Sequence, residues 1–97
     1  MALAAGERRP DDGVMTTAAR HWDVRLELIE SEDYCEVVAH LVAGDRGLSG
    51  VGRSRRNPAD PTVPQVGEEL ATARALHDLA HHLSQDAWRM IEEYQAP

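Results

Sequence analysis

Strict alternation of apolar and polar residues opens the patterned part of the chain, in "HWDVRLELIE" (21–30). Its apolar positions are Trp22, Val24, Leu26 and Leu28. A period of two is typical of a β-strand with one buried face. "YCEVVAHLVA" (34–43) and "LSGVGRSR" (48–55) also have the character of strands, and the turn sequences "SED" and "GDRG" separate the three. The pattern therefore predicts a three-stranded antiparallel sheet joined by hairpins.

The period becomes helical from Val66 onward, where apolar residues recur at steps of three and four. These positions are Leu70, Ala73, Leu76, Ala80, Leu83, Ala87, Met90 or Ile91, and Tyr94. At 1.5 Å per residue, a helix over 66–94 would be about 43 Å long, which is more than short strands can cover. Either the helix breaks near "LSQD" (83–86), or its end packs on something else.

Two glycines on the third strand predict how sheet and helix meet. Gly50 and Gly52 lie two apart, so they share the core face, where glycine lets another backbone come close. The helix offers the small residues Ala71, Ala73 and Ala75 in return. A phosphate-cradling loop is the alternative, but it needs glycines at the start of a helix, and fourteen residues separate Gly52 from Gly67.

Together these elements predict an α+β domain over 21–97, with one long or two consecutive C-terminal helices after the sheet. Residues 1–20 show no sustained period and are broken by proline, glycine and charge, which predicts a disordered tail. So small a domain buries barely enough apolar surface to offset the entropy of folding. A single cysteine excludes an internal disulfide. We therefore expect a homodimer.

Apolar residues outside the predicted core are the candidates for the dimer interface. On the outer face of the sheet they are Val38, Val42 and Val51, and on the helix Trp88 lies off the apolar stripe. Tryptophan is a frequent anchor of protein interfaces. The alternative for Trp88 is that it covers an edge of its own sheet.

The candidate nucleic-acid-binding residues are Arg25, Arg46, Arg53, Arg55 and Arg56. Arginine contacts to phosphates provide most non-specific affinity for nucleic acid. The formal net charge of -7 opposes such binding, however, and no aromatic residues are interleaved for base stacking. Solvated arginines paired with neighbouring glutamates, or contact with an acidic protein, are the alternatives.

Little in the sequence indicates catalysis. His77 and His81 have an i, i+4 spacing that suits zinc, but no third ligand is evident, so exposed helix histidines are the simpler interpretation. Cys35 is expected inward on the second strand as a small core residue. We expect no enzyme, cofactor, metal or small-molecule substrate. No apolar segment reaches the length of about 20 residues that a membrane requires, and we expect a cytoplasmic protein.

One stretch resembles a known family: a Gly-x-Gly pair, then arginine and "NPADP", then "VP" and "GEELATARALHDL". Over 21–91 the chain is similar to a small actinobacterial family of uncharacterised function. The resemblance implies a homodimer with a double-stranded-RNA-binding-domain-like fold. A stress-induced member has been likened in shape to ribosome hibernation-promoting factors. It thus implies a stress-linked protein that associates with the ribosome or RNA through the sheet arginines. A homodimeric protein-interaction module without nucleic-acid or catalytic role is the alternative.

Overall fold

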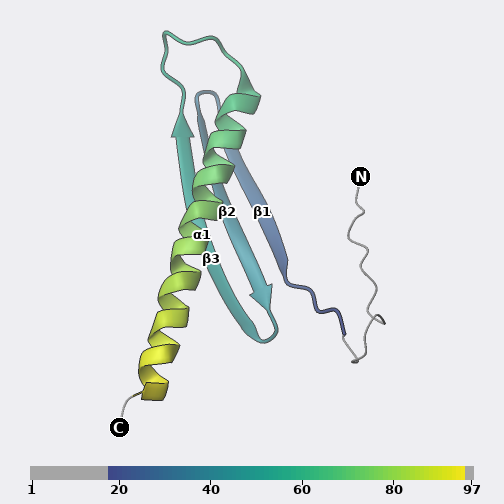
Figure 1. Cartoon of the computed structure of the whole chain (residues 1–97). Coiled ribbons are helices and arrows are strands. Elements are labelled where there is room, and N and C mark those ends of the chain that lie inside the picture. Colours follow the sequence, from purple (N-terminus) through teal and green to yellow (C-terminus); the bar gives the residue numbers. More distant parts are fainter. Residues whose placement is uncertain (1–17, 96–97) are drawn as a thin grey trace.

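The structure, a computed structural model, describes residues 18–95 and contains one sheet and one helix (Figure 1). The elements follow in the order β1 (Asp23–Ser31), β2 (Tyr34–Ala43), β3 (Arg46–Arg55) and α1 (Pro64–Gln95). β2 is the central strand and pairs antiparallel with both neighbours. The predicted α+β class is confirmed, and the helix is a single continuous one of 32 residues. Residues 1–17, most of the expected tail, lie outside the described part of the chain.

The strand register divides the sheet into two faces. Cys35, Val37, Ala39 and Leu41 of β2 are buried, and they face α1. Opposite Val37 and Ala39, β3 places Gly52 and Gly50. From the helix, Ala71, Ala75 and Leu79 complete the buried core. The hairpin between β2 and β3 turns at Gly44, whose φ of 67° is one that glycine adopts without strain.

Close approach of two backbones is what the glycine pair permits. A Cβ atom added at Gly50 would lie 2.8 Å from the Cα atom of Leu79, and one added at Gly52 would lie 2.7 Å from the Cβ atom of Arg74. Real side chains do not tolerate such distances, so the glycines let α1 lie directly on β3. The predicted role is confirmed for Ala71 and Ala75, whereas Ala73 is exposed.

The helix buries a different stripe from the one its apolar periodicity marks. The stripe that runs from Leu70 through Leu76 to Tyr94 is largely exposed, and Leu83 is only partly buried. The reason is steric: glycines on β3 draw the side of the helix with alanines against the sheet, and larger residues are turned aside. The C-terminal part of α1 extends beyond the end of the sheet (Figure 1), where Tyr94 is 89% exposed.

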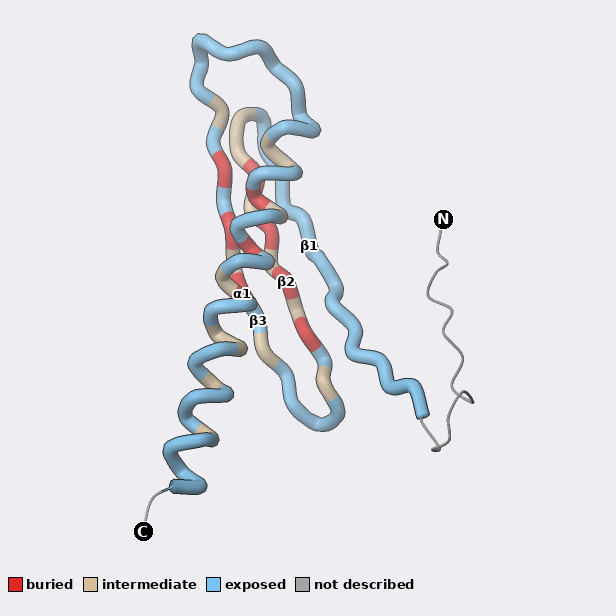
Figure 2. The backbone as a smooth tube through the Cα atoms, in the orientation of Figure 1, coloured by how far each residue is buried: buried red, intermediate tan, exposed pale blue. Residues whose placement is uncertain are grey.

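β1 differs from the other strands because α1 does not cover it. The helix packs on β3 and β2, and every residue of β1 is exposed (Figure 2). The sequence predicted that the apolar side of this strand would be half-buried. Its exposed fractions are 44% at Val24, 39% at Leu26 and 43% at Leu28, so that prediction is wrong for the single chain.

Candidate functional site

An uncovered apolar surface lies between β1 and α1. Val24, Leu26 and Leu28 are register partners of Leu41, Ala39 and Val37, so they stand on the helix side of the sheet. On α1, Leu76 and Leu83 are seven residues apart and therefore share one face. That face is turned toward β1, since the opposite side of the helix bonds to the far edge of β3. We call this set of five residues the β1–α1 surface.

Three helix side chains close the free edge of β3. At successive four-residue steps on α1, Arg74 donates from Nη1 to the Arg53 carbonyl (2.7 Å), and Asp78 Oδ2 accepts from the Val51 amide (2.9 Å). One turn further, Nδ1 of His82 lies 2.8 Å from the Ser49 carbonyl oxygen. Unpaired backbone N–H and C=O groups on an edge strand can hydrogen-bond to a strand of another chain. This row of bonds, which we call the edge ladder, satisfies three of them, so β1 remains the edge without such cover.

The spacing of the edge-ladder residues is visible in the sequence, but their partners are not. Arg74 bonds to the backbone of β3 at Arg53, 21 positions earlier in the chain. The 74–78–82 spacing was the available signal, because residues four apart lie on one helix face. Nothing in the sequence shows which strand edge that face meets, so the interaction needed the tertiary structure to be seen.

The predicted interface residues do not form one surface. Val38 and Val51 are cross-strand partners on the outer face of the sheet and are half-buried, and Val42 on the same face is 57% exposed. Trp88, 63% exposed, belongs to α1 on the other side of the sheet (Figure 1). The valines and the tryptophan are thus separated by the sheet itself.

The five predicted arginines are also divided. Alternation along the paired strands puts Arg25, Arg53 and Arg55 on the outer face. Arg46 is on the helix side, where it pairs with the carboxylate of Asp86. Arg56 begins the connection after β3, and Asp33 holds it there through contacts of 2.9 Å from both Nε and Nη2. The structure therefore places three of the five on one face, with Arg25 on β1 and with Arg53 and Arg55 on β3.

The outer face carries charges of both signs. Arg53 Nε lies 3.6 Å from the Glu36 carboxylate, and the Arg55 guanidinium stacks 5.2 Å above the centre of the Tyr34 ring. His40 Nε2 lies 3.4 Å from Glu27. Because acidic residues alternate with the arginines across the strands, this face presents no continuous positive band.

The helix histidines divide in the same way. His82 belongs to the edge ladder, whereas His77 and His81 are exposed. Within residues 18–95, no group of three histidine, cysteine, aspartate or glutamate side chains is placed to hold a metal ion.

None of the helix residues that the structure describes form a segment long and apolar enough to span a bilayer.

Comparison with known proteins places this arrangement in a family. The model of the Rv2632c-like family matches residues 20–97. Uncharacterized protein Mb1767 of Mycobacterium bovis is 40% identical over 73 residues, which cover 75% of this chain and 78% of that protein. Uncharacterized protein Rv2632c of Mycobacterium tuberculosis is 46% identical over 61 residues, or 63% of each chain. The crystal structure of Rv2632c covers 84% of this chain and 96% of its own with a TM-score of 0.76 and 33% identity. The uncharacterised mycobacterial proteins Mb1767 and Rv2632c are its relatives, and the chain therefore belongs to the Rv2632c-like family.

Proposed function

We propose that this chain is a homodimeric protein-interaction module that joins its second copy through the β1–α1 surface. The observation that carries the proposal is the uncovered apolar side of β1, next to a helix stripe that is itself largely exposed. Contiguous apolar surface of this kind is typical of protein interfaces. A 78-residue ordered unit with a core of seven small or medium apolar side chains also has little stability to spare.

Charge favours a second copy as the occupant. The chain has a formal net charge of -7, so two copies repel each other over most of their surfaces. The β1–α1 surface is built from uncharged residues, and a two-fold contact brings like patches together. Two copies can therefore meet there without opposing carboxylates. The closed edge of β3 directs association to the same side, because only β1 leaves its edge without helix cover.

Analytical ultracentrifugation of wild type, Leu26→Glu and Val42→Glu tests the proposal. Val42 is the matched control because it is an exposed apolar residue on the outer face of the same sheet. Burying the exposed 39% of Leu26 contributes about 0.6–1.2 kcal/mol per copy, taken from about 1.5–3 kcal/mol for a whole side chain. Desolvating the new carboxylate adds at least about 1 kcal/mol per copy.

With both copies altered, Leu26→Glu should weaken dimerisation by about 3 kcal/mol or more, which raises Kd at least about 100-fold. We expect a dimeric wild type, a dimeric Val42→Glu variant and a folded, monomeric Leu26→Glu variant. A monomeric wild type at micromolar concentration contradicts the proposal. Dissociation by Val42→Glu alone would instead locate the interface on the outer face.

Association with RNA or the ribosome, together with a stress-linked role, is the second candidate. It is favoured by the three arginines that share the outer face, Arg25, Arg53 and Arg55. Sedimentation with purified ribosomes at two salt concentrations tests it, because phosphate contacts weaken steeply as salt rises. We expect salt-sensitive pelleting that the double variant Arg53→Glu, Arg55→Glu abolishes. No pelleting at low salt would exclude this function.

A further inference from the structure

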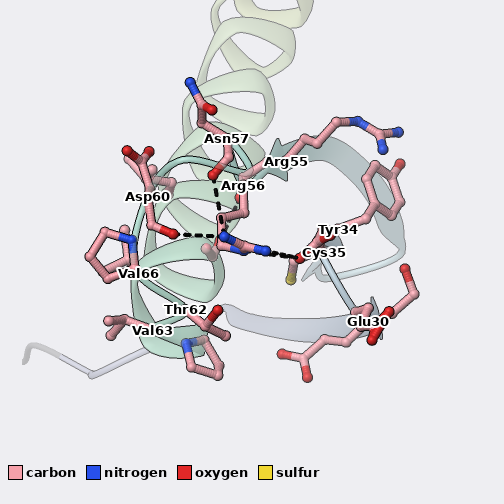
Figure 3. A pocket seen from close by; sticks show the side chains of 18 residues that line it. Glu30, Tyr34, Cys35, Arg55, Arg56, Asn57, Asp60, Thr62, Val63 and Val66 are labelled. Atoms are coloured by element: carbon pink, nitrogen blue, oxygen red, sulfur yellow. Dashed lines mark hydrogen bonds and ion pairs between the residues drawn. The ribbon is translucent and has the colours of Figure 1, made fainter.

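A cavity of about 540 Å³ lies at the end of the molecule where α1 begins. The β1–β2 turn, the end of β3, the connection over 56–63 and the first turns of α1 surround it (Figure 3). Its volume is within the range of sites for small molecules. The cavity is separate from the β1–α1 surface, since none of the five residues of that surface lines it.

Arg56 fixes the wall of this cavity. Its Nη1 donates to the Asp60 carbonyl at 2.7 Å, while Nε and Nη2 hold Asp33 on the β1–β2 turn. The Arg56 amide also donates to the Asp33 carbonyl at 2.9 Å. One guanidinium thus ties the connection to the turn (Figure 3). These hydrogen bonds therefore fix the residues around the cavity, and the charge of Arg56 is neutralised by Asp33.

The lining combines apolar side chains with carboxylates. Three apolar side chains line the cavity, those of Val63, Val66 and Leu70. Each is about half exposed, so these residues do not contribute to the buried core. Glu30 also lines the cavity. Hydrogen bonding to Glu30, together with the repulsion between the two carboxyl groups, raises the pKa of Glu68, so the two side chains lie close together.

Other groups of the lining respond to the negative charge or add to it. Cys35 lines the cavity and is only 5% exposed. Burial and the nearby carboxylates of Glu30 and Glu68 raise the pKa of its thiol. Glu32 and Asp60 line the cavity as well. The second arginine of the lining, Arg55, has its guanidinium over the Tyr34 ring on the outer face. The lining therefore disfavours an anion and suits a cation with an apolar body.

We infer that this cavity binds a small apolar amine, with its alkyl part against Val63, Val66 and Leu70 and its ammonium group at the Glu30–Glu68 pair. A cation there offsets the repulsion that raises the pKa of Glu68, so that pKa falls toward its ordinary value on binding. At a pH near or below the raised pKa, binding therefore releases a proton from Glu68, and the affinity rises as the pH rises through that pKa.

Titration of the full chain with hexylammonium, hexanol and hexanoate, followed by amide chemical shifts and calorimetry, tests this inference. We expect shifts at the cavity and roughly fivefold tighter binding of hexylammonium than of hexanol, as for a well-placed exposed ion pair. The double variant Glu30→Gln, Glu68→Gln should bind both equally. Glu27→Gln, on the outer face of the same strand, is the matched control and should keep the preference.

Three results would overturn the inference. They are binding of hexanoate as tight as that of hexylammonium, a preference that survives in the double variant, and shifts that are absent or lie away from the cavity. The double variant removes a repulsive contact, so it is expected to fold, which a circular dichroism melt confirms. The outcome is independent of the proposed dimer, because Leu26→Glu lies outside the cavity and should leave amine binding unchanged.

Discussion

Replacing Gly52 by alanine should strongly destabilise the fold, although it adds only one methyl group. The added Cβ atom would collide with the Ala71 carbonyl oxygen and the Ala75 amide nitrogen, and it would lie 2.7 Å from the Cβ atom of Arg74. Overpacking costs about 1–3 kcal/mol where side chains can shift aside. Here two of the three atoms belong to the helix backbone, so α1 itself has to move. We therefore expect a loss of about 3 kcal/mol or more.

That loss is large for a domain of this size. At about 0.05–0.15 kcal/mol per residue, the 78 described residues correspond to a free energy of unfolding of about 4–12 kcal/mol. Gly47→Ala is the matched control, because a Cβ atom there meets only the Leu41 carbonyl oxygen at 3.8 Å. Its stability should be unchanged or slightly raised, since alanine has less freedom than glycine in the unfolded chain.

Urea denaturation followed by circular dichroism, at one protein concentration for all variants, measures the difference. We expect a much lower midpoint for Gly52→Ala and a wild-type midpoint for Gly47→Ala. A Gly52→Ala variant within about 0.5 kcal/mol of wild type would refute the close packing of α1 on β3. Equal losses for both variants would show that any alanine in β3 is harmful, and the steric explanation would then fail.

Three further predictions concern single side chains. Glu68→Gln should raise the melting temperature at neutral pH. The folded chain raises the pKa of Glu68 above its ordinary value of 4.5, so the free energy of unfolding falls as the pH rises from 4.5 through the raised pKa. Glutamine does not ionise, so the variant does not lose stability in this way. A calorimetric series from pH 4 to 8 checks this, and a variant that melts below wild type at pH 7 contradicts it. Asp78→Ala should cost about 1–2 kcal/mol in urea because the Val51 amide loses its acceptor, whereas Asp78→Asn, which keeps a side-chain oxygen, should retain most of the stability. Arg56→Ala should cost about 2 kcal/mol and speed proteolysis within 56–63, and unchanged proteolysis would show that another contact holds this connection.

Local patterns in the sequence predicted the elements of this fold, and the contacts between elements account for what they missed. Period-two alternation located the first strand, strand-like stretches between turn sequences located the other two, and the glycine pair predicted where the helix approaches the sheet. These signals are local, because they depend on neighbours in the sequence. Which strands the helix would cover depends on its sideways position, and that is set by the edge ladder between α1 and the backbone of β3. For the same reason the exposure of Leu26 could not be predicted from its own pattern.

Two of the five predicted arginines lie apart from the others because each pairs with a carboxylate that is distant in the sequence. Arg46 and Asp86 are forty positions apart in the chain, yet they form an ion pair that joins the start of β3 to the C-terminal half of α1. Arg56 and Asp33 are brought together in the same way by the end of the sheet. A count of arginines therefore overstated the positive surface, since two of five were already engaged in holding the fold.

The same contacts that stabilise the fold also create the surface proposed for association. Gly50 and Gly52 draw α1 onto β3, and the edge ladder holds it at the side of the sheet away from β1. A helix in that position cannot cover Val24, Leu26 and Leu28, so their exposure is a consequence of how the core is built. A second copy can then cover the β1–α1 surface without any rearrangement of the core. Loosening the helix by Gly52→Ala should therefore weaken association as well as stability, because Leu76 and Leu83 would move with the helix while the β1 residues stay in place.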